Sequence, residues 1–544
     1  MSDVLLTGIA VALFLYSVHY WNFLCDDSFI SFRYARNLVE GHGLRYNLNE
    51  NPPVEGYSNF LWVLIMALVM KLGASPLVAS RIISVTCGVV LLVLVYRTSR
   101  YTLGLGRLQA FAGSLFCAFM PPFTVWATGG LETMLFVLLF YLQFTLLLEA
   151  SAVFPLKRAA VLGLLLMLLR PEGIGYAVLL VLIAALYYRY SGRRGNWRGG
   201  IVRYLMVLAA GLLILTIFRL VYFHAPLPNT FYAKVGFTHD QVKRGVFYVV
   251  HFMFDFPGAF LALFAAGVAL RRKAVPGEVW AVTALAVIFI VIQILLGGDF
   301  MAMARFMVPL VPLLGLLTAA ALCPPSGSLK RPVGLVLLVV TAGAMGLNML
   351  PRFDLHATPL SWRERVHFRW NHVYYMSEHE YWYRMKVNVE QWTLIGNLLR
   401  SMSTPDQSIV TGGIGAMGYY SRMRVYDKFG LVSREVARSD IPRDQMSAGH
   451  DKSVDPFFFS KYHPDYVDPR LVILEDVENW KIKMMRSLLV RSKSHNRSHL
   501  RERFLQFKED YEIFTHPVSY QFEGDPMIFI TVRLKESARD RPGT

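Results

Sequence analysis

The sequence predicts an all-α polytopic membrane domain followed by a soluble α/β or α+β domain. Hydrophobic residues make up 54% of the 544 residues and charged residues 17%, a balance typical of proteins with many membrane spans. Long apolar segments recur as far as residue 350, and beyond it polar and apolar residues are mixed. We therefore assign residues 1–350 to a transmembrane domain, with a first outer loop at 25–76, and residues 351–544 to a C-terminal domain.

The first expected span is Val4–Leu24, which matches the roughly 20 residues that a membrane helix needs. It lacks the basic start and small-residue cleavage site of a signal peptide. Later apolar segments bring the expected number of spans to about eleven: 77–96, 108–127, 131–148, 158–169, 174–188, 204–223, 246–270, 279–297, 304–323 and 332–350.

Loop charge orients these spans. With the N-terminus in the cytoplasm, every second loop is rich in Lys and Arg, as cytoplasmic loops are. These loops lie at 97–107, 157–158, 189–203, 271–273 and 330–331, and they account for much of the net charge of +17 without nucleic acid. Asn59–Leu72 is too short for a comfortable span, so we expect a helix lying at the outer face. The C-terminal domain is then extracytoplasmic.

Polar residues gather at the outer ends of the spans. They are Asp26 and Asp27; Glu55, Tyr57 and Asn59; Glu132; Arg170 and Glu172; Asn229, Tyr232 and Lys234; and Asp299 and Arg305. Ionisable groups are costly at a membrane boundary unless they face water, a metal or a substrate, so the pattern predicts a hydrated cavity. The cysteines (Cys25, Cys87, Cys117 and Cys323) show no metal-ligand spacing and predict no disulfide framework.

Such a cavity suits group transfer to an alcohol. A carboxylate can act as general base toward a sugar hydroxyl, and a cation can stabilise a phosphate leaving group. Nucleotides are scarce outside the cytoplasm, so an activated sugar there would have to arrive on a membrane lipid phosphate. Aromatic residues suited to sugar rings are Tyr34, Tyr46, Tyr57, Trp62 and Tyr232.

Several motifs carry a family resemblance. Those of the first outer loop are Asp26-Asp27-Ser28-Phe29-Ile30-Ser31-Phe32-Arg33-Tyr34-Ala35-Arg36, Gly41-His42-Gly43-Leu44 and Glu55-Gly56-Tyr57-Ser58-Asn59. Later ones are Gly129-Gly130-Leu131-Glu132-Thr133, Arg170-Pro171-Glu172-Gly173, Pro228-Asn229-Thr230-Phe231-Tyr232, Gly298-Asp299, Asp427-Lys428-Phe429-Gly430-Leu431 and Gly449-His450-Asp451-Lys452. Together they resemble the GT-C glycosyltransferases, and more closely the mycobacterial terminal arabinofuranosyltransferases and their proteobacterial relatives.

The resemblance implies a GT-C-like domain, a polyprenyl-phosphate sugar donor and a catalytic aspartate in the first outer loop. Asp26 or Asp27 would be the base. We give Asp26 a slight preference because it lies at the membrane edge, with Asp27 orienting the acceptor or helping to hold a divalent cation. No cofactor is certain, because GT-C enzymes differ in whether they need a metal.

The cations divide between donor binding and structure. Lys234 and Arg305 are the first candidates for the donor phosphate and Arg170 the next, although Arg170 could equally form a structural ion pair. Arg33 and Arg36 could face lipid head groups or the donor. Candidates for substrate binding are Glu55, Tyr57, Asn59, Glu132, Glu172, Asn229, Tyr232 and Asp299.

The C-terminal region is expected to hold a helix at 391–400 and strands near 408–410, 424–429, 471–474, 511–515 and 527–532. The segment Gly413–Gly418 matches GxGxxG, but we expect a strand rather than a helix after it and reject dinucleotide binding. His367, His372 and His379 match no zinc spacing. The basic stretch 481–503 is typical of a solvated helix face, with anionic head groups or a charged glycan as the alternative contact.

These observations predict a glycosyltransferase of a bacterial cytoplasmic (inner) membrane. By the resemblance it moves arabinofuranose from a polyprenyl-phosphate donor to a glycan, glycolipid or surface-protein acceptor. The alternative is a transporter or flippase of a lipid-linked glycan, which should show inverted repeats and interrupted helices with polar groups near the midplane. A non-catalytic assembly protein ranks last, because about eleven spans exceed what an anchor needs.

Overall fold

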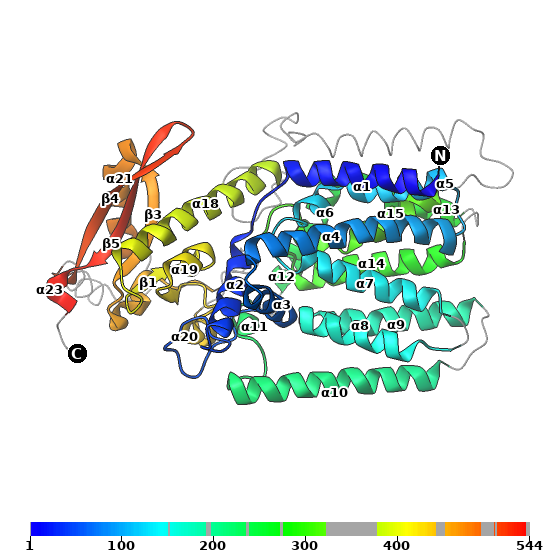
Figure 1. The fold of residues 1–544 in the computed structure, drawn as a ribbon, viewed down its shortest axis with the longest axis horizontal. Coiled ribbons are helices and arrows are strands. Elements are labelled where there is room, and N and C mark those ends of the chain that lie inside the picture. Colours follow the sequence, from blue (N-terminus) through cyan, green and yellow to red (C-terminus); the bar gives the residue numbers. More distant parts are fainter. Residues whose placement is uncertain are drawn as a thin grey trace.

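A bundle of apolar helices carries a smaller sheet-containing part at one end (Figure 1). The computed structural model describes residues 2–150, 153–191, 197–234, 239–271, 276–322, 378–441, 452–490, 505 and 509–539. The N-terminal end of the first helix lies at the end of the bundle far from the sheet (Figure 1). The predicted order, a helical membrane part and then an α/β or α+β part, is confirmed.

The helical part follows the apolar segments of the sequence. Its helices are α1 (Asp3–Tyr20), α2 (Asp26–Val39), α3 (Phe60–Lys71), α4 (Pro76–Arg97), α5 (Arg107–Ala118), α6 (Pro121–Val125), α7 (Thr133–Leu148), α8 (Leu156–Leu169), α9 (Gly173–Tyr190), α10 (Arg198–Tyr222), α11 (Asn229–Lys234), α12 (His239–Asp255), α13 (Pro257–Arg271), α14 (Glu278–Leu296) and α15 (Leu310–Ala321). The short helix expected at Asn59–Leu72 is α3, and it packs against α2.

Five of the described helices are long and apolar enough to cross a membrane by themselves: α1, α4 with the π-turn after it, α9, α10 and α14. The chain is therefore a multi-pass membrane protein. The segment 246–270, expected as one span, is instead broken after Asp255, and α12 and α13 meet at a bend of 94°. Pro257 disfavours helical backbone in the residue before it, which explains the break. The segment 332–350 lies outside the described residues, and the number of about eleven spans stays a prediction.

The C-terminal part is built on a five-stranded mixed sheet of order β2-β1-β3-β5-β4. The strands are β1 (Ser408–Thr411), β2 (Arg424–Asp427), β3 (Tyr466–Ile473), β4 (Tyr511–Phe522) and β5 (Asp525–Leu534). β1 pairs in parallel with β2 and β3, and β5 pairs antiparallel with β3 and β4. All five strands overlap the predicted ones, although β4 is much longer than expected.

One long helix joins the two parts. α18 (Glu378–Met402) includes the short helix predicted at 391–400 and, at 1.5 Å per residue, spans about 37 Å from the bundle to the sheet (Figure 1). The remaining C-terminal helices are α19 (Ala416–Ser421), α20 (Arg434–Arg438), α21 (Val477–Val490) and α23 (Glu536–Arg539). His367, His372 and most of the basic stretch 481–503 lie outside the part that the structure describes.

The first outer loop is the surface on which the C-terminal part docks. The Arg33 guanidinium donates to the carbonyls of Gly418 at 2.6 Å and Met423 at 2.7 Å. The Asn47 side chain exchanges two hydrogen bonds of 2.9 Å with the backbone of Val425. Arg36 donates to the Tyr419 carbonyl at 2.7 Å. Both arginines therefore bind the protein's own backbone, and the expectation that they face lipid or the donor was wrong.

The glycine-rich turn before α19 also differs from prediction. A helix, α19, follows it, where we expected a strand. Asp26 at the start of α2 caps that helix from outside. The Asp26 carboxylate accepts hydrogen bonds from the backbone N–H groups of Gly415 at 3.0 Å and Ala416 at 2.7 Å. A carboxylate at a helix N-terminus satisfies donors that have no partner inside the helix.

Candidate active site

A cavity of about 490 Å³, lined by both apolar and charged side chains, lies between the first outer loop, the ends of several bundle helices and the C-terminal part. Its polar and charged lining comes from helices α2, α10, α11 and α12, from the loops before α3, α7 and α9, and from the segment after α14. Predicted site residues in the lining are Asp27, Tyr57, Asn59, Glu132, Arg170, Glu172, Lys234, Asp299 and Arg305. Lining residues that sequence reasoning did not single out include Arg219, Gln241 and Arg244, and Ser31 and Leu431 of the quoted motifs line the cavity as well.

The two adjacent aspartates have different surroundings. Asp26 is held by the N-terminus of α19 and does not line the cavity. Burial raises its pKa to about 7, and the N–H groups of Ala416 and Gly415 oppose that shift. Asp27 lines the cavity, and within the described ranges no side chain forms a hydrogen bond or ion pair with its carboxylate. Asp27 therefore presents an available proton acceptor to the cavity.

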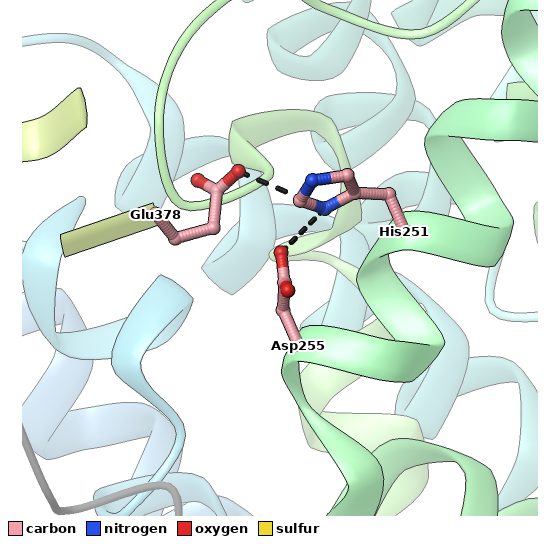
Figure 2. A group of neighbouring side chains, drawn as sticks. All are labelled: His251, Asp255 and Glu378. Carbon is pink, nitrogen blue, oxygen red and sulfur yellow. Dashed lines mark ion pairs between the residues drawn. The ribbon is translucent and has the colours of Figure 1, made fainter. Parts of the chain in front are cut away.

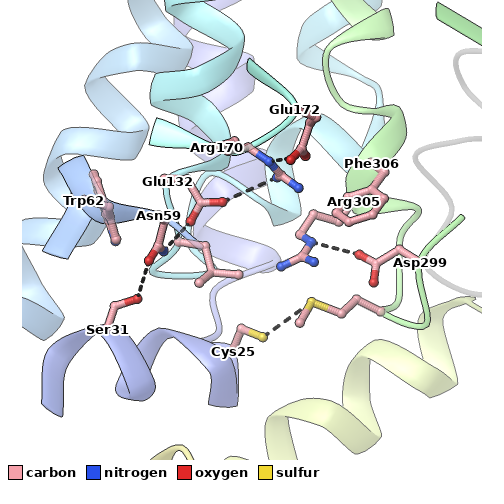
Figure 3. Close-up of polar contacts among 12 residues, drawn as sticks. Cys25, Ser31, Asn59, Trp62, Glu132, Arg170, Glu172, Asp299, Arg305 and Phe306 are labelled. Atoms are coloured by element: carbon pink, nitrogen blue, oxygen red, sulfur yellow. Dashed lines mark hydrogen bonds and ion pairs between the residues drawn. The ribbon is translucent and has the colours of Figure 1, made fainter. Parts of the chain in front are cut away.

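A hydrogen-bonded chain of side chains fixes one wall of the cavity (Figure 3). Ser31 donates to the Asn59 side-chain oxygen at 3.1 Å, and Asn59 donates to Glu132 at 2.7 Å. Arg170 continues the chain, with contacts of 3.4 Å to Glu132 and 2.6 Å to Glu172. The structural ion pair considered for Arg170 and Glu172 is thus present. Because each member has a partner, this wall presents a rigid polar surface.

Arg305 forms the opposite wall with Asp299, at 2.8 Å (Figure 3). Its guanidinium lies 4.8 Å from the ring centre of Phe306 and 5.6 Å from that of Trp126, distances typical of cation–π contacts. Asp27 and Glu132 are also within electrostatic range of Arg305. The ion pair uses only part of the guanidinium, which carries five N–H donors, so the same side chain can still bind an anion.

Lys234 differs from these arginines. It lies at the end of α11 and lines the cavity, and no described residue forms an ion pair or hydrogen bond with its ammonium group. The buried Tyr57 hydroxyl also lacks a hydrogen-bond partner among the residues of known placement. An unpaired ammonium group and an unpaired hydroxyl are suited to bind a polar ligand.

Four predicted site residues lie outside the lining. Besides Asp26, these are Glu55, Asn229 and Tyr232. The Asn229 side chain donates to the carbonyls of Gly430 at 2.7 Å and Leu431 at 3.1 Å. The Tyr232 ring centre lies 5.1 Å from the Arg438 guanidinium. Both residues thus contact the C-terminal part.

Of the aromatic residues considered for sugar binding, only Tyr57 lines the cavity. Tyr34, Tyr46 and Trp62 are fully buried in the core. These residues bind the protein itself: the Trp62 indole N–H, for example, donates to the Gly130 carbonyl at 3.1 Å.

Glu55 supports the cavity from behind through a buried ion pair. The Arg219 side chain donates to its two carboxylate oxygens at 2.9 and 3.1 Å, and the side chains are 7% and 3% exposed for Arg219 and Glu55. Sequence reasoning missed Arg219 because it lies inside an apolar segment far from Glu55 in the chain. One signal could have found it: a charged side chain inside an apolar segment costs free energy unless it has a partner of opposite charge.

We expect Arg219→Met to destabilise the protein by about 3–5 kcal/mol, since it leaves the Glu55 carboxylate buried without its partner. Thermal unfolding in detergent, followed by intrinsic fluorescence, would measure the loss. The double variant Glu55→Gln/Arg219→Met should recover part of it. A double variant as unstable as the sum of the two single ones would contradict this account.

Comparison with known proteins gives matches of three kinds. The sequence model of a family described as a domain of unknown function (DUF8728) matches residues 379–527. The terminal beta-(1->2)-arabinofuranosyltransferase of Mycobacterium tuberculosis is 30% identical over 277 residues, which are 45% of this chain and 40% of that protein. The match therefore spans less than half of that curated relative.

The solved structures of ArnT from Cupriavidus metallidurans are similar over nearly the whole chain. The undecaprenyl phosphate complex superposes with a TM-score of 0.53 and the apo state with 0.52. Each alignment has 13% sequence identity and covers 97% of both chains. At 13% sequence identity, the likeness of the structures establishes the fold alone. The chain thus has a GT-C fold like that of ArnT and resembles a terminal arabinofuranosyltransferase in sequence, as its motifs predicted.

Proposed function

We propose that the chain is a membrane glycosyltransferase that moves a sugar from a polyprenyl-phosphate donor to a hydroxyl of a cell-envelope acceptor. The ArnT complex with undecaprenyl phosphate supports the donor class, and the arabinofuranosyltransferase relative supports arabinofuranose as the sugar. The acceptor is a glycan, glycolipid or surface protein. In the proposed topology the N-terminus is cytoplasmic, residues 1–350 form the catalytic domain of an inner-membrane enzyme, and residues 351–544 form an extracytoplasmic domain.

One observation carries the proposal. Asp27 and Lys234, whose carboxylate and ammonium groups have no hydrogen-bond or ion-pair partner among the described residues, line the same cavity at the end of the bundle that contacts the C-terminal part. In the proposed reaction the acceptor oxygen attacks the anomeric carbon, and Asp27 accepts the hydroxyl proton. The bond from that carbon to the phosphate oxygen breaks, and Lys234 and Arg305 stabilise the departing polyprenyl phosphate. We now favour Asp27 over Asp26 as the base, because Asp26 binds the backbone of the C-terminal part.

The remaining cavity side chains are proposed to bind and orient the substrates. Glu132 and Asn59 present a fixed polar edge to sugar hydroxyl groups, and Tyr57, two residues before Asn59, lines the same cavity. Arg170 and Glu172 neutralise each other in part, so we assign them to positioning more than to phosphate binding. Glu55, Asn229 and Tyr232 would act indirectly, by holding the cavity wall.

The proposal is tested by sugar transfer from synthetic polyprenyl-phosphoryl arabinofuranose to simple glycan acceptors, using purified protein in detergent. A panel of other lipid-linked pentoses and hexoses separates a wrong sugar from a wrong reaction. Lys234→Gln should raise the KM for the donor about 10- to 150-fold, since a hydrogen bond to a charged group contributes about 1.5–3 kcal/mol. Asp240→Asn, an exposed change on α12, is the control.

A transporter of lipid-linked glycan remains the rival, and the bend between α12 and α13 is the kind of interruption that transporters show. The charged side chains of the cavity nevertheless come mainly from the first outer loop and from the ends of bundle helices. Donor binding without consumption of any donor in the panel, together with movement of the lipid across proteoliposomes, would favour transport.

A further inference from the structure

Three side chains with metal-ligand chemistry meet one another (Figure 2), and none of the three lines the cavity described above. His251 and Asp255 lie one turn apart on α12, and Glu378 is the first residue of α18. Each offers one ligand atom, and the three atoms lie within 4.8 Å of one another. The His251 Nδ1 atom contacts the Asp255 carboxylate and lies 3.8 Å from Glu378 Oε1.

The cluster is shielded from solvent. The three side chains are only 13%, 10% and 9% exposed for His251, Asp255 and Glu378. Removing two carboxylates from water is costly unless opposite charge compensates them. A protonated imidazole compensates one carboxylate, whereas a divalent cation compensates both and leaves the imidazole neutral, the form in which it binds metals.

We propose that His251, Asp255 and Glu378 bind one divalent transition-metal ion, with Zn²⁺ favoured and Mn²⁺ as the second candidate. Imidazole nitrogen and carboxylate oxygen are ligands of both ions. Ligand atoms bound tetrahedrally at about 2.0–2.2 Å from Zn²⁺ lie about 3.3–3.6 Å apart. The observed separation of 3.8 Å between Nδ1 and Oε1 is close to that value, so small side-chain rotations complete the site.

The ion would hold together two parts of the chain that are distant in sequence, and one of its ligands contacts a third part. It joins the end of α12 to the start of α18, and Glu378 also accepts a hydrogen bond from the Met303 backbone N–H. Met303 and Ala304 have left-handed backbone with φ of 56° and 42°, and Arg305 of the cavity follows them directly. The metal therefore has a structural role that reaches the cavity through this short segment.

The test is the metal content of the full-length protein, purified in detergent without chelator or added metal and measured by elemental mass spectrometry. We expect about one Zn²⁺ or Mn²⁺ per wild-type chain and an affinity at least about tenfold lower in Asp255→Asn. Asp255→His replaces one metal-ligating side chain by another and should keep the metal. Metal lost in Asp255→Asn but kept in Asp255→His would therefore reflect the lost ligand and not lost folding. The matched controls on α12 are His239→Gln and Asp240→Asn, both at exposed positions.

A second measurement uses protein stripped with chelator and titrated with Zn²⁺ or Mn²⁺. The proposal expects Tm to rise for wild type and Asp255→His, and to rise less at the same metal concentration for Asp255→Asn. It is overturned if the stripped wild type takes up neither ion, or if Asp255→Asn matches wild type in both uptake and Tm. Neither measurement needs a sugar donor, so its outcome is independent of the proposed transferase activity.

Discussion

Asp27→Asn is expected to lower sugar transfer by about 10²- to 10⁴-fold, the contribution typical of a general base, while donor binding is retained. Asp27 is the cavity carboxylate without a hydrogen-bond or ion-pair partner among the described residues. An amide of the same shape cannot accept the acceptor proton. Initial rates measured with the lipid-linked sugar that wild type turns over give the effect on kcat, and equilibrium binding of the lipid gives the effect on affinity.

The control for this prediction is the neighbouring residue. Asp26→Asn removes a carboxylate that binds backbone N–H groups, so we expect its activity to fall only in proportion to the folded protein lost. If Asp26→Asn were well folded but inactive, and Asp27→Asn active, the base would be Asp26 and our assignment of the two roles would be wrong.

Gly415→Ala is expected to separate the C-terminal part from the first outer loop. A Cβ atom at Gly415 would lie 1.9 Å from the Asp26 backbone oxygen and 2.5 Å from its carboxyl carbon. Backbone atoms cannot move aside as a flexible side chain can, so the two Asp26 hydrogen bonds should be lost. Hydrogen bonds to a charged group contribute about 1.5–3 kcal/mol each, which predicts a lower Tm and lower transfer activity.

Limited proteolysis before α18 and thermal unfolding would measure that separation. Gly175→Ala is the matched control, because a Cβ atom there meets nothing within 4 Å and alanine suits its helix. The account fails if Gly415→Ala and Gly175→Ala show the same Tm, proteolysis and activity as wild type.

Local patterns in the sequence predicted much of the architecture. The length of the apolar segments predicted most of the bundle helices, and the short apolar run at 59–72 predicted α3. The predicted strand positions overlap all five strands. The gathering of polar residues at span ends predicted the cavity, and nine of the thirteen predicted site residues line it: Asp27, Tyr57, Asn59, Glu132, Arg170, Glu172, Lys234, Asp299 and Arg305. These signals work because hydrophobicity and charge act over a few neighbouring residues.

What the sequence did not predict are contacts between distant residues. The position at the membrane edge did not reveal the different surroundings of Asp26 and Asp27, since Asp26 binds a turn hundreds of residues away. Arg33 resembles a membrane-surface cation until the carbonyls of Gly418 and Met423 are placed beside it. His251 and Glu378 likewise become neighbours only when α18 returns to the end of α12.

The Asp26 link also has a consequence for biosynthesis. Its partners, Gly415 and Ala416, follow it by 389 and 390 residues in the chain. At a ribosomal rate of about 5–20 residues per second, about 20–80 seconds pass between the synthesis of Asp26 in α2 and the synthesis of the residues that bind it. Ribosomes that stop before residue 416 would leave α2 without its cap although α1–α15 are complete. Synthesis of Gly415 and Ala416 thus sets the earliest moment at which this loop can acquire its final form.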